Sequence, residues 1–282
     1  MQKPLWLVVE LILLVLIFFG GSLYFWKQNK QDSFEVVFLN VGQGDAILIQ
    51  DGELQVLIDG GRDGKVLLDR LGRYVPFWDR VLEVVVATHP DSDHIGGLPA
   101  VLKNYQVEMV MTNGHTSDTE TSRLFEKLAI EKAGQRKEIA LGTEILFPSE
   151  AKLNFLYPLL PLPNKSVVET NEGSLVARLD VMDTSFLFTG DLPREEFALM
   201  SIEPVDVLKV AHHGSKYSSS GVFLDKVKPR DAVISVGQNS YGHPAGEVLK
   251  NLEERKIQIY RTDEEGDIVY RCEKATRQCV KK

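Results

Sequence analysis

Four side chains of the kinds that bind divalent metal ions lie within six consecutive residues of this chain. They are His89, Asp91, Asp93 and His94. The apolar run at 81–87 predicts a buried strand before them, and residues 95–103 predict a helix after them. Side chains on such a strand-to-helix turn can converge on one point. A helix cap at Asp93 or a surface histidine at His94 would each explain one residue, but not all four.

Polar side chains also follow three other predicted strands. They are Asp59, Asp191 and the pair His212 and His213. Strand ends are where α/β folds place their chemistry. Each ending alone is equally consistent with a turn, since Asp-Gly and Gly-Asp pairs are common in turns. One shared site explains the three endings together with the His-Asp cluster.

Strands and helices alternate along the rest of the chain. Strands are predicted at 34–39, 46–50, 54–58, 81–87, 107–112, 185–189, 205–210, 231–235 and 257–260. Helices are predicted at 64–73, 95–103, 119–133, 194–200, 220–227 and 245–255. This alternation predicts the α/β class, and the tight turn at Asp51 and Gly52 favours a partly antiparallel sheet. The irregular stretch at 158–173 is expected to be a surface loop on the rim of a site.

The N-terminal segment is strongly apolar. From Leu5 to Trp26 only Glu10 is charged, and these 22 residues exceed the roughly 20 that a helical membrane span requires. A cleaved signal peptide is the alternative, but no small-x-small cleavage site precedes Lys27. We therefore predict a transmembrane anchor at 5–26, a linker at 27–33 and one folded domain at 34–282.

The two cysteines bear on the compartment of the domain. Cys272 and Cys279 lie in a segment that predicts a hairpin, whose strands a disulfide could bridge. A disulfide would indicate an oxidising compartment outside the cytoplasm. Two free thiols are nearly as consistent with the sequence, and the few lysines around the span do not decide its orientation. The expectation is a single-pass membrane protein with an extracytoplasmic domain.

The balance of charge limits how a polyanion could bind. With 32 Lys and Arg against 40 Asp and Glu, the formal net charge is −8, which is not the electrostatic footprint of broad nucleic-acid binding. A polyanionic substrate must therefore be recognised locally, and a metal site can supply the positive charge. The positive charge near the histidine pair amounts at most to a small basic neighbourhood, made of Lys209, Lys216, Lys226, Lys228 and Arg230.

Several motifs in this chain resemble those of the metallo-β-lactamase fold superfamily. The superfamily is indicated by Leu57-Ile-Asp-Gly-Gly61 and Thr88-His-Pro-Asp-Ser-Asp-His-Ile-Gly-Gly97, with Phe188-Thr-Gly-Asp191 further along. Three others narrow the resemblance to the C-terminal domain of the competence protein ComEC: Asn40-Val-Gly-Gln-Gly-Asp45, Leu208-Lys-Val-Ala-His-His-Gly-Ser215 and Tyr241-Gly-His-Pro244. The resemblance covers about residues 35–267. It implies a four-layer αββα sandwich with a two-metal site at one edge of the sheets.

The resemblance also implies a role for each candidate residue. The implied metal ligands are His89, Asp91, Asp93, His94, Asp191 and His213. The first two would serve one ion, the next two and His213 the other, and Asp191 would bridge them. Asp59 and His212 would support these ligands, although packing is an equal alternative for His212. His243 and Lys216 would contact the substrate or donate a proton, with a structural role as an even alternative for His243.

Two departures from the superfamily pattern concern the metal. The usual pattern is His-x-His-x-Asp-His, and Asp91 stands where its second histidine would be. A carboxylate there favours Mn²⁺ or Mg²⁺ over Zn²⁺ without excluding zinc. The histidine usually found before the bridging aspartate is also missing near residues 171–175, so the first site is expected to be weaker or open. His115 could fill that position, but an exposed loop histidine is the favoured interpretation.

The glycine-rich segment at 40–45 is a weak signal by itself. It lacks the Gly-Lys-Ser/Thr ending of a phosphate-binding loop. A tight turn between the first two strands is slightly favoured over a substrate role for Gln43 or Asp45.

The implied ligand set predicts a metal-dependent hydrolase. Two divalent ions about 3.5–4 Å apart can bind a water between them and lower its pKa, which suits phosphodiester hydrolysis. The expected function is a membrane-anchored phosphodiesterase or nuclease of the ComEC type, with DNA as a candidate substrate and two Mn²⁺ or Zn²⁺ ions, or Mg²⁺, as cofactors. The alternatives are hydrolysis of another ester, a thioester, a lactone, a β-lactam or an envelope phosphocholine ester. A non-catalytic membrane-tethered binding module is a further alternative.

Overall fold

The computed structural model describes residues 10, 12–18, 20–21, 34–162 and 169–282. Most of the predicted anchor at 5–26 and all of the linker at 27–33 lie outside the described residues. In the part of the chain that is described, no helix is both long and apolar enough to cross a bilayer. The division into anchor, linker and domain therefore stays a prediction.

An eight-stranded sheet, here called sheet A, is built from both ends of the domain. In spatial order its strands are β15 (Gln278–Lys281), β14 (Ile268–Glu273), β1 (Phe34–Phe38), β2 (Ile47–Asp51), β3 (Leu54–Ile58), β4 (Val81–Ala87), β5 (Gln106–Thr112) and β6 (Gln135–Glu138). Strands β3 to β6 are parallel, and the remaining pairs are antiparallel. The predicted antiparallel part is thus present at the early strands.

A seven-stranded sheet, sheet B, faces the first. Its strands in spatial order are β13 (Gln258–Arg261), β12 (Asp231–Ile234), β11 (Val207–Lys209), β10 (Thr184–Phe188), β9 (Val176–Val181), β8 (Lys152–Tyr157) and β7 (Glu144–Leu146). Strands β10 to β13 are parallel, and the others are antiparallel. The sequence prediction missed β6 to β9, because β6 is polar and mostly exposed, β7 is three residues long, and β8 and β9 mix polar with apolar residues.

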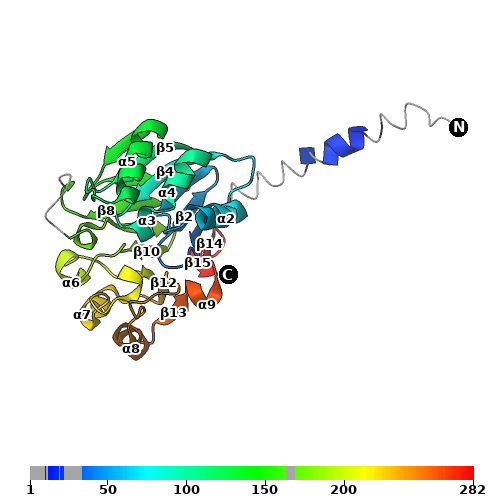
Figure 1. Cartoon of the computed structure of the whole chain (residues 1–282). Coiled ribbons are helices and arrows are strands. Elements are labelled where there is room, and N and C mark those ends of the chain that lie inside the picture. The colour runs from blue at the N-terminus through cyan, green and yellow to red at the C-terminus, as the bar shows by residue number, and fades with distance from the viewer. Residues whose placement is uncertain (1–9, 11, 19, 22–33, 163–168) are drawn as a thin grey trace.

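Helices cover the outer face of each sheet (Figure 1). The helices of the described domain are α2 (Gly64–Tyr74), α3 (Ser92–Ile95), α4 (Leu98–Asn104), α5 (Glu120–Lys132), α6 (Glu195–Ala198), α7 (Gly221–Val227), α8 (Gly246–Glu254) and α9 (Thr262–Glu265). The single helix predicted at 95–103 is in fact two short helices, α3 and α4, separated by Gly96 and Gly97.

Three apolar cores define the layers of the molecule. One lies between the sheets and includes Phe38, Phe186 and Tyr270. A second packs α2, α4 and α5 on sheet A, and a third packs α7 and α8 on sheet B. Because each sheet buries side chains on both of its faces, the order of layers is helix, sheet, sheet, helix. The predicted αββα sandwich is confirmed.

The C-terminal hairpin carries a disulfide. Cys272 on β14 and Cys279 on β15 are register partners, and their sulfur atoms are bonded. Of the two alternatives that the sequence left open, the structure has the disulfide.

Candidate metal centre

The candidate site lies where parallel strands of both sheets end. Asp59 follows β3, His89 follows β4 and Asp191 lies three residues after β10. His212 and His213 belong to a short 3₁₀ helix, η2 (Ala211–Gly214), after β11. Carboxyl ends of parallel strands lie at the same edge of a sheet, so the packing of the two sheets brings these residues together.

Two glycines let the backbone loops of the site pack against each other. A Cβ atom at Gly97 would lie 2.1 Å from the carbonyl oxygen of Gly60, and one at Gly44 would lie 2.0 Å from that of Asp93. The amide of Gly60 donates to the carbonyl oxygen of His94 at 2.6 Å, which ties the loop after β3 to α3. Any side chain at Gly97 or Gly44 would force the ligand-bearing turn away from its support.

Four of the six predicted ligands form one compact cluster, which we call the central cluster: Asp93, His94, Asp191 and His213. Oδ2 of Asp191 lies 3.2 Å from Nε2 of His94 and 3.4 Å from Nε2 of His213. Nε2 of His213 lies 3.6 Å from Oδ2 of Asp93. Asp93 forms a group of possible ligands with His94 and His213, and Asp191 shares such groups with His89 and His94 and with Asp45 and His213.

The histidines of this cluster have their tautomers set by second contacts. Nδ1 of His94 donates to Oδ2 of Asp59 at 2.8 Å, and Nδ1 of His213 donates to the carbonyl oxygen of Ser235 at 2.8 Å. Each ring therefore keeps a proton on Nδ1, and Nε2 is the nitrogen that faces the cluster and can bind a metal ion once it has lost its own proton. Both Nε2 atoms are buried without a hydrogen-bond partner in the described structure, which fits a divalent metal ion.

His89 is oriented by a chain of hydroxyl groups. Oγ1 of Thr88 donates to Asp59 at 2.7 Å and lies 3.0 Å from Nδ1 of His89. Oγ of Ser174 lies 3.3 Å from the same nitrogen. The Nε2 atom of His89 is buried without a partner and can join Asp191 and His94 as a ligand group. Asp59 thus supports both His89 and His94 and is itself buried.

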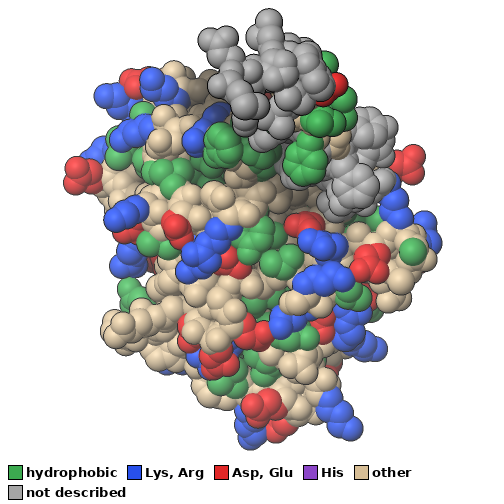
Figure 2. Space-filling model, turned by 90° about the vertical axis from the view of Figure 1, so that its right-hand side faces the viewer, with side chains coloured by type: hydrophobic (Ala, Val, Ile, Leu, Met, Phe, Trp, Pro, Cys, Tyr) green, Lys and Arg blue, Asp and Glu red, His purple; other side chains and the backbone are tan. Residues whose placement is uncertain are grey.

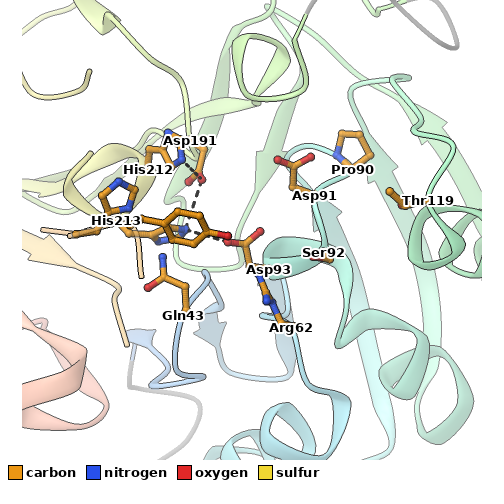
Figure 3. Close-up of a pocket in the computed structure, with 12 residues that line it drawn as sticks. Gln43, Arg62, Pro90, Asp91, Ser92, Asp93, Thr119, Asp191, His212 and His213 are labelled. Atoms are coloured by element: carbon orange, nitrogen blue, oxygen red, sulfur yellow. Dashed lines mark ion pairs between the residues drawn. The ribbon is translucent and has the colours of Figure 1, made fainter. Parts of the chain in front are cut away.

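Asp91 stands apart from the central cluster. Its Oδ2 lies 3.8 Å from Nε2 of His89, and its side chain is 36% exposed. It lines a pocket of about 300 Å³ together with Asp93, Asp191 and His213. Figure 3 shows Asp91 on the side of this pocket away from the ion pairs that join His213 to Asp93 and Asp191. Among the described residues, Asp91 belongs to none of the groups of three whose possible ligand atoms lie within 4.8 Å of one another.

The charges of the central cluster stabilise one another. Burial by itself would raise the pKa of Asp191, but His213 and His94 hold it well below its ordinary value. Burial by itself would lower the pKa of His213, but Asp191 and neighbouring carboxylates raise it to about 9. A metal ion that binds His213 must therefore displace a proton.

A buried ion pair lies beneath the cluster, and sequence reasoning missed it. Nζ of Lys209 contacts Oδ2 of Asp45 and donates to the carbonyl oxygen of Gly190 at 2.8 Å. The same ammonium group lies 3.7 Å from Oδ1 of Asp191. Lys209 is 1% exposed, so this member of the basic neighbourhood lies inside the protein and not on its surface. The glycine-rich segment does form a turn, but its Asp45 belongs to the site. The motif at 40–45 was the sequence signal that could have assigned Asp45 to the site.

Strained backbone accompanies these residues. Asp59, His212 and His213 have φ values of 58°, 51° and 54°, in the left-handed region that non-glycine residues rarely adopt. Such strain persists only where surrounding contacts overdetermine the geometry, and it concentrates at functional sites.

Comparison with known families identifies this geometry. Residues 39–238 match the family model described as the metallo-beta-lactamase superfamily. The chain belongs to the metallo-beta-lactamase superfamily. It therefore has the fold of that superfamily's metal-dependent hydrolases, with a His and Asp cluster at the corresponding sheet edge.

The curated relatives are competence and recombination proteins. The chain is 33% identical to ComE operon protein 3 of Bacillus subtilis over 84% of its own length and 33% of the relative. It is 29% identical to Recombination protein 2 of Haemophilus influenzae, over 88% of the chain and 30% of the relative. It is 30% identical to Competence protein ComA of Neisseria gonorrhoeae, over 91% and 35%. The chain thus spans about a third of the length of these relatives, and the expected ComEC-like resemblance is confirmed.

Solved structures share the superfamily fold. The metallo-beta-lactamase fold protein YhfI from Bacillus subtilis matches with a TM-score of 0.58 and 15% identity, over 85% of this chain and 99% of YhfI. CmlA, a diiron beta-hydroxylase from Streptomyces venezuelae, matches with a TM-score of 0.54 and 12% identity, over 84% and 53%. Identities this low relate the folds only.

Ser174 lies near the position where the metallo-beta-lactamase pattern places the histidine that this sequence lacks. Oγ of Ser174 accepts from the amide of Asp191 at 3.2 Å and contacts His89. His115 does not join the cluster, and the expectation of an exposed loop position is wrong, since His115 is 6% exposed. Burial lowers the pKa of His115.

Of the other residues predicted for this metallo-beta-lactamase site, the structure places His212 and His243 at the pocket and Lys216 away from it. His212 and His243 both line the pocket, and their rings lie 5.3 Å apart. Nε2 of His212 lies 3.8 Å from Asp191, and Asn171 of the predicted rim loop contacts its ring. Lys216 is exposed, does not line the pocket, and has its ammonium group 5.0 Å from the ring centre of Tyr217. Gln43, for which the sequence ranked a substrate role slightly below a turn, lines the pocket. Arg62, which the sequence did not single out, lines it as well.

Proposed function

We propose that this chain is a metal-dependent phosphodiesterase that cleaves nucleic-acid strands and is held at a membrane by its N-terminal segment. The observation that carries the proposal is the central cluster, in which two carboxylates and two imidazoles lie within 3.2 to 3.6 Å of one another in a continuous series of contacts. These four residues would hold one divalent ion, and His89 with Asp91 would hold a second beside Asp191.

Bound divalent ions would supply Lewis-acid activation of water and charge stabilisation at a phosphoryl group. The chain's own residues keep the site ready for them. Asp59 and the carbonyl group of Ser235 hold the protons of His94 and His213 on Nδ1. His243 would donate a hydrogen bond or a proton to an oxygen of the phosphodiester, and Arg62 would hold a second oxygen.

The substrate class is proposed from the ligand set and from the relatives. A site with three aspartates offers hard oxygen ligands, which suit Mn²⁺ or Mg²⁺ and the phosphoryl oxygens that those ions bind. The Haemophilus influenzae relative is named Recombination protein 2, and this name supports the choice of DNA as the proposed substrate. Asp91, and Ser174 near the expected place of the missing histidine, depart from the three-histidine zinc site and so disfavour the β-lactam alternative.

Membrane attachment is proposed from the apolar segment at 5–26. The disulfide between Cys272 and Cys279 supports a domain on the extracytoplasmic side. The chain should stay in the membrane pellet after carbonate washing, and its cysteines should resist thiol labelling until a reductant is added. Release into the supernatant, or labelling of both thiols in intact protein, would contradict this part of the proposal.

The enzymatic proposal is tested with the full chain in detergent. Mn²⁺ and Zn²⁺ are titrated against single-stranded DNA and a small chromogenic phosphodiester, in wild type, Asp93→Ala and the control Asp69→Ala. Asp69 is exposed on α2 and pairs with Arg73, so its loss should leave turnover intact. We expect metal-dependent cleavage that Asp93→Ala lowers at least a hundredfold while circular dichroism stays unchanged. Bound metal without turnover of either substrate would favour the non-catalytic binding module.

A further inference from the structure

Tyr241 is an aromatic side chain at the mouth of the pocket that the metal centre does not use. It is 66% exposed, yet it lines the same pocket as Asp93 and Asp191. Among the described residues, it is the only large apolar side chain that is both exposed and part of this lining. An aromatic face held in water beside a catalytic pocket is a potential stacking surface.

The ring of Tyr241 is supported from behind. It lies 5.7 Å from the ring of His243, with an angle of 30° between the planes, so the two rings are stacked. His243 meets the edge of His212 at 5.3 Å and 77°, and Nε2 of His212 lies 3.8 Å from Asp191. Three side-chain contacts therefore connect Tyr241 to the central cluster.

The loop that carries Tyr241 is held in place by Asn239. Its Oδ1 accepts from the amides of Tyr241 and His243, both at 3.1 Å. Its Nδ2 donates to the carbonyl oxygens of Gly237 at 2.9 Å and of His243 at 2.8 Å. The ring is thus presented by a braced turn, and a ligand that stacks on it loses little to ordering the loop.

The protein side chains that line this pocket provide little electrostatic attraction for a nucleic-acid strand. Its lining contains Asp91, Asp93 and Asp191 against Arg62 as its one arginine or lysine. The chain carries a net charge of −8, and basic and acidic side chains are interspersed on the face in Figure 2. Stacking of bases on aromatic rings does not depend on net charge and tolerates any base sequence.

We propose that Tyr241 is a base-stacking subsite, which binds an unpaired base next to the phosphodiester held in the pocket. The inference rests on the proposed phosphodiesterase function and narrows its substrate to nucleotide-containing phosphodiesters with an unstacked base. A base inside a duplex is covered on both faces, so a single strand or a strand end is the form that fits.

The first test compares two esters that share a leaving group. Thymidine 5′-(p-nitrophenyl phosphate) and methyl p-nitrophenyl phosphate differ in whether a nucleoside is attached. With the full chain in detergent and Mn²⁺, we expect a higher kcat/KM for the nucleoside ester. Y241A should lower that preference by roughly five- to a hundredfold, as loss of one stacking contact does. Y241F and Y241W should keep it, since both retain an aromatic face.

Phe197→Ala is the matched control, because Phe197 is 70% exposed on α6 and does not line the pocket. It should keep the wild-type preference. An unchanged preference in Y241A overturns the proposal. An equal loss of kcat/KM for both esters in Y241A does so too, because it marks a structural effect on the metal centre.

The second test reads stacking without turnover. A single-stranded oligonucleotide containing 2-aminopurine is titrated into the full chain in EDTA, and base stacking is followed as quenching of its fluorescence. Wild type and Y241F should quench, and Y241A should not. If wild type hydrolyses neither ester, the proposed function fails, and this titration still decides the subsite. Equal quenching by wild type and Y241A overturns the subsite, and quenching that depends on Tyr241 upholds it.

Discussion

Lys209 and Asp45 form an ion pair that is sealed beneath the metal centre, with both side chains at most 2% exposed. The ammonium group also faces Asp191 and the carbonyl oxygen of Gly190. Burial by itself would lower the pKa of Lys209, but Asp45 and Asp191 raise it above its ordinary value, so the lysine stays charged. Lys209 thus neutralises part of a carboxylate-rich interior and faces the Oδ1 side of Asp191.

Removing this cation should be costly. Lys209→Met leaves Asp45 buried without its partner, and the free energy of unfolding should fall by about 3–5 kcal/mol. The double variant Lys209→Met/Asp45→Asn removes both charges and should recover part of that loss. Urea denaturation followed by circular dichroism measures each value. Lys127→Met, which breaks an exposed pair with Glu131, is the control and should cost less than about 1 kcal/mol. If Lys209→Met and Lys127→Met lower the free energy of unfolding equally, Lys209 does not stabilise the buried carboxylates.

Asp59→Asn should weaken metal binding more than it weakens the fold. The carboxylate of Asp59 accepts from His94 at 2.8 Å and from Thr88, and through Thr88 it reaches His89. Loss of such a supporting carboxylate typically costs about 10–100-fold in metal affinity. Competition with a chelating dye gives the affinity, and Asp69→Asn serves as the exposed control. A wild-type affinity in Asp59→Asn would show that the histidines orient themselves.

Asp91→His should shift the metal preference toward zinc. It replaces a hard carboxylate by an imidazole and restores the His-x-His-x-Asp-His pattern. Because Asp91 lies at the pocket with its side chain 36% exposed, an imidazole can be accommodated there. After dialysis against equal concentrations of Mn²⁺ and Zn²⁺, elemental analysis should find a bound Zn²⁺ to Mn²⁺ ratio several-fold above wild type. Asp91→Asn is the control for loss of the carboxylate alone. A similar Zn²⁺ to Mn²⁺ ratio in Asp91→His and Asp91→Asn would count against Asp91 as a metal ligand.

Glu195 should make stability depend on pH. Burial raises its pKa from 4.5 to about 7, while both carboxylate oxygens accept from the amide of Ser219 at 3.0 Å. The folded protein therefore binds this proton more tightly than the unfolded chain. The stabilising contribution is complete below about pH 4.5 and is lost as pH rises through about 7, by about 3 kcal/mol at most.

Glu195→Gln isolates that contribution. A neutral amide cannot ionise, so the difference in unfolding free energy between the variant and wild type should move in the variant's favour from pH 5 to pH 8. Denaturant unfolding at each pH provides the values. Glu203→Gln, an exposed position, should show no such trend. Parallel pH curves for wild type and Glu195→Gln would mean that Glu195 ionises as easily in the folded state as in the unfolded chain.

The local sequence determined the turn that carries the ligands. His89, Asp93 and His94 follow an unbroken apolar strand and precede Gly96 and Gly97, and a strand, a turn and a helix start form from contacts within about twenty residues. Periodicity likewise placed most of the strands and helices. It could not place β6 to β9, because their pairing partners rather than their own residues stabilise them.

Only the tertiary structure decided which distant polar groups meet. Lysine is a residue type that usually lies on the surface. Lys209 is buried because sheet B packs on sheet A and brings Asp45 to its ammonium group. The support of His213 is a backbone carbonyl of Ser235, which no residue type encodes. His115 is buried in a loop that the sequence predicts to be exposed. The partners and the burial of these side chains depend on how the two sheets pack. That packing consists of contacts between residues far apart in the sequence, and local sequence patterns do not reveal such contacts.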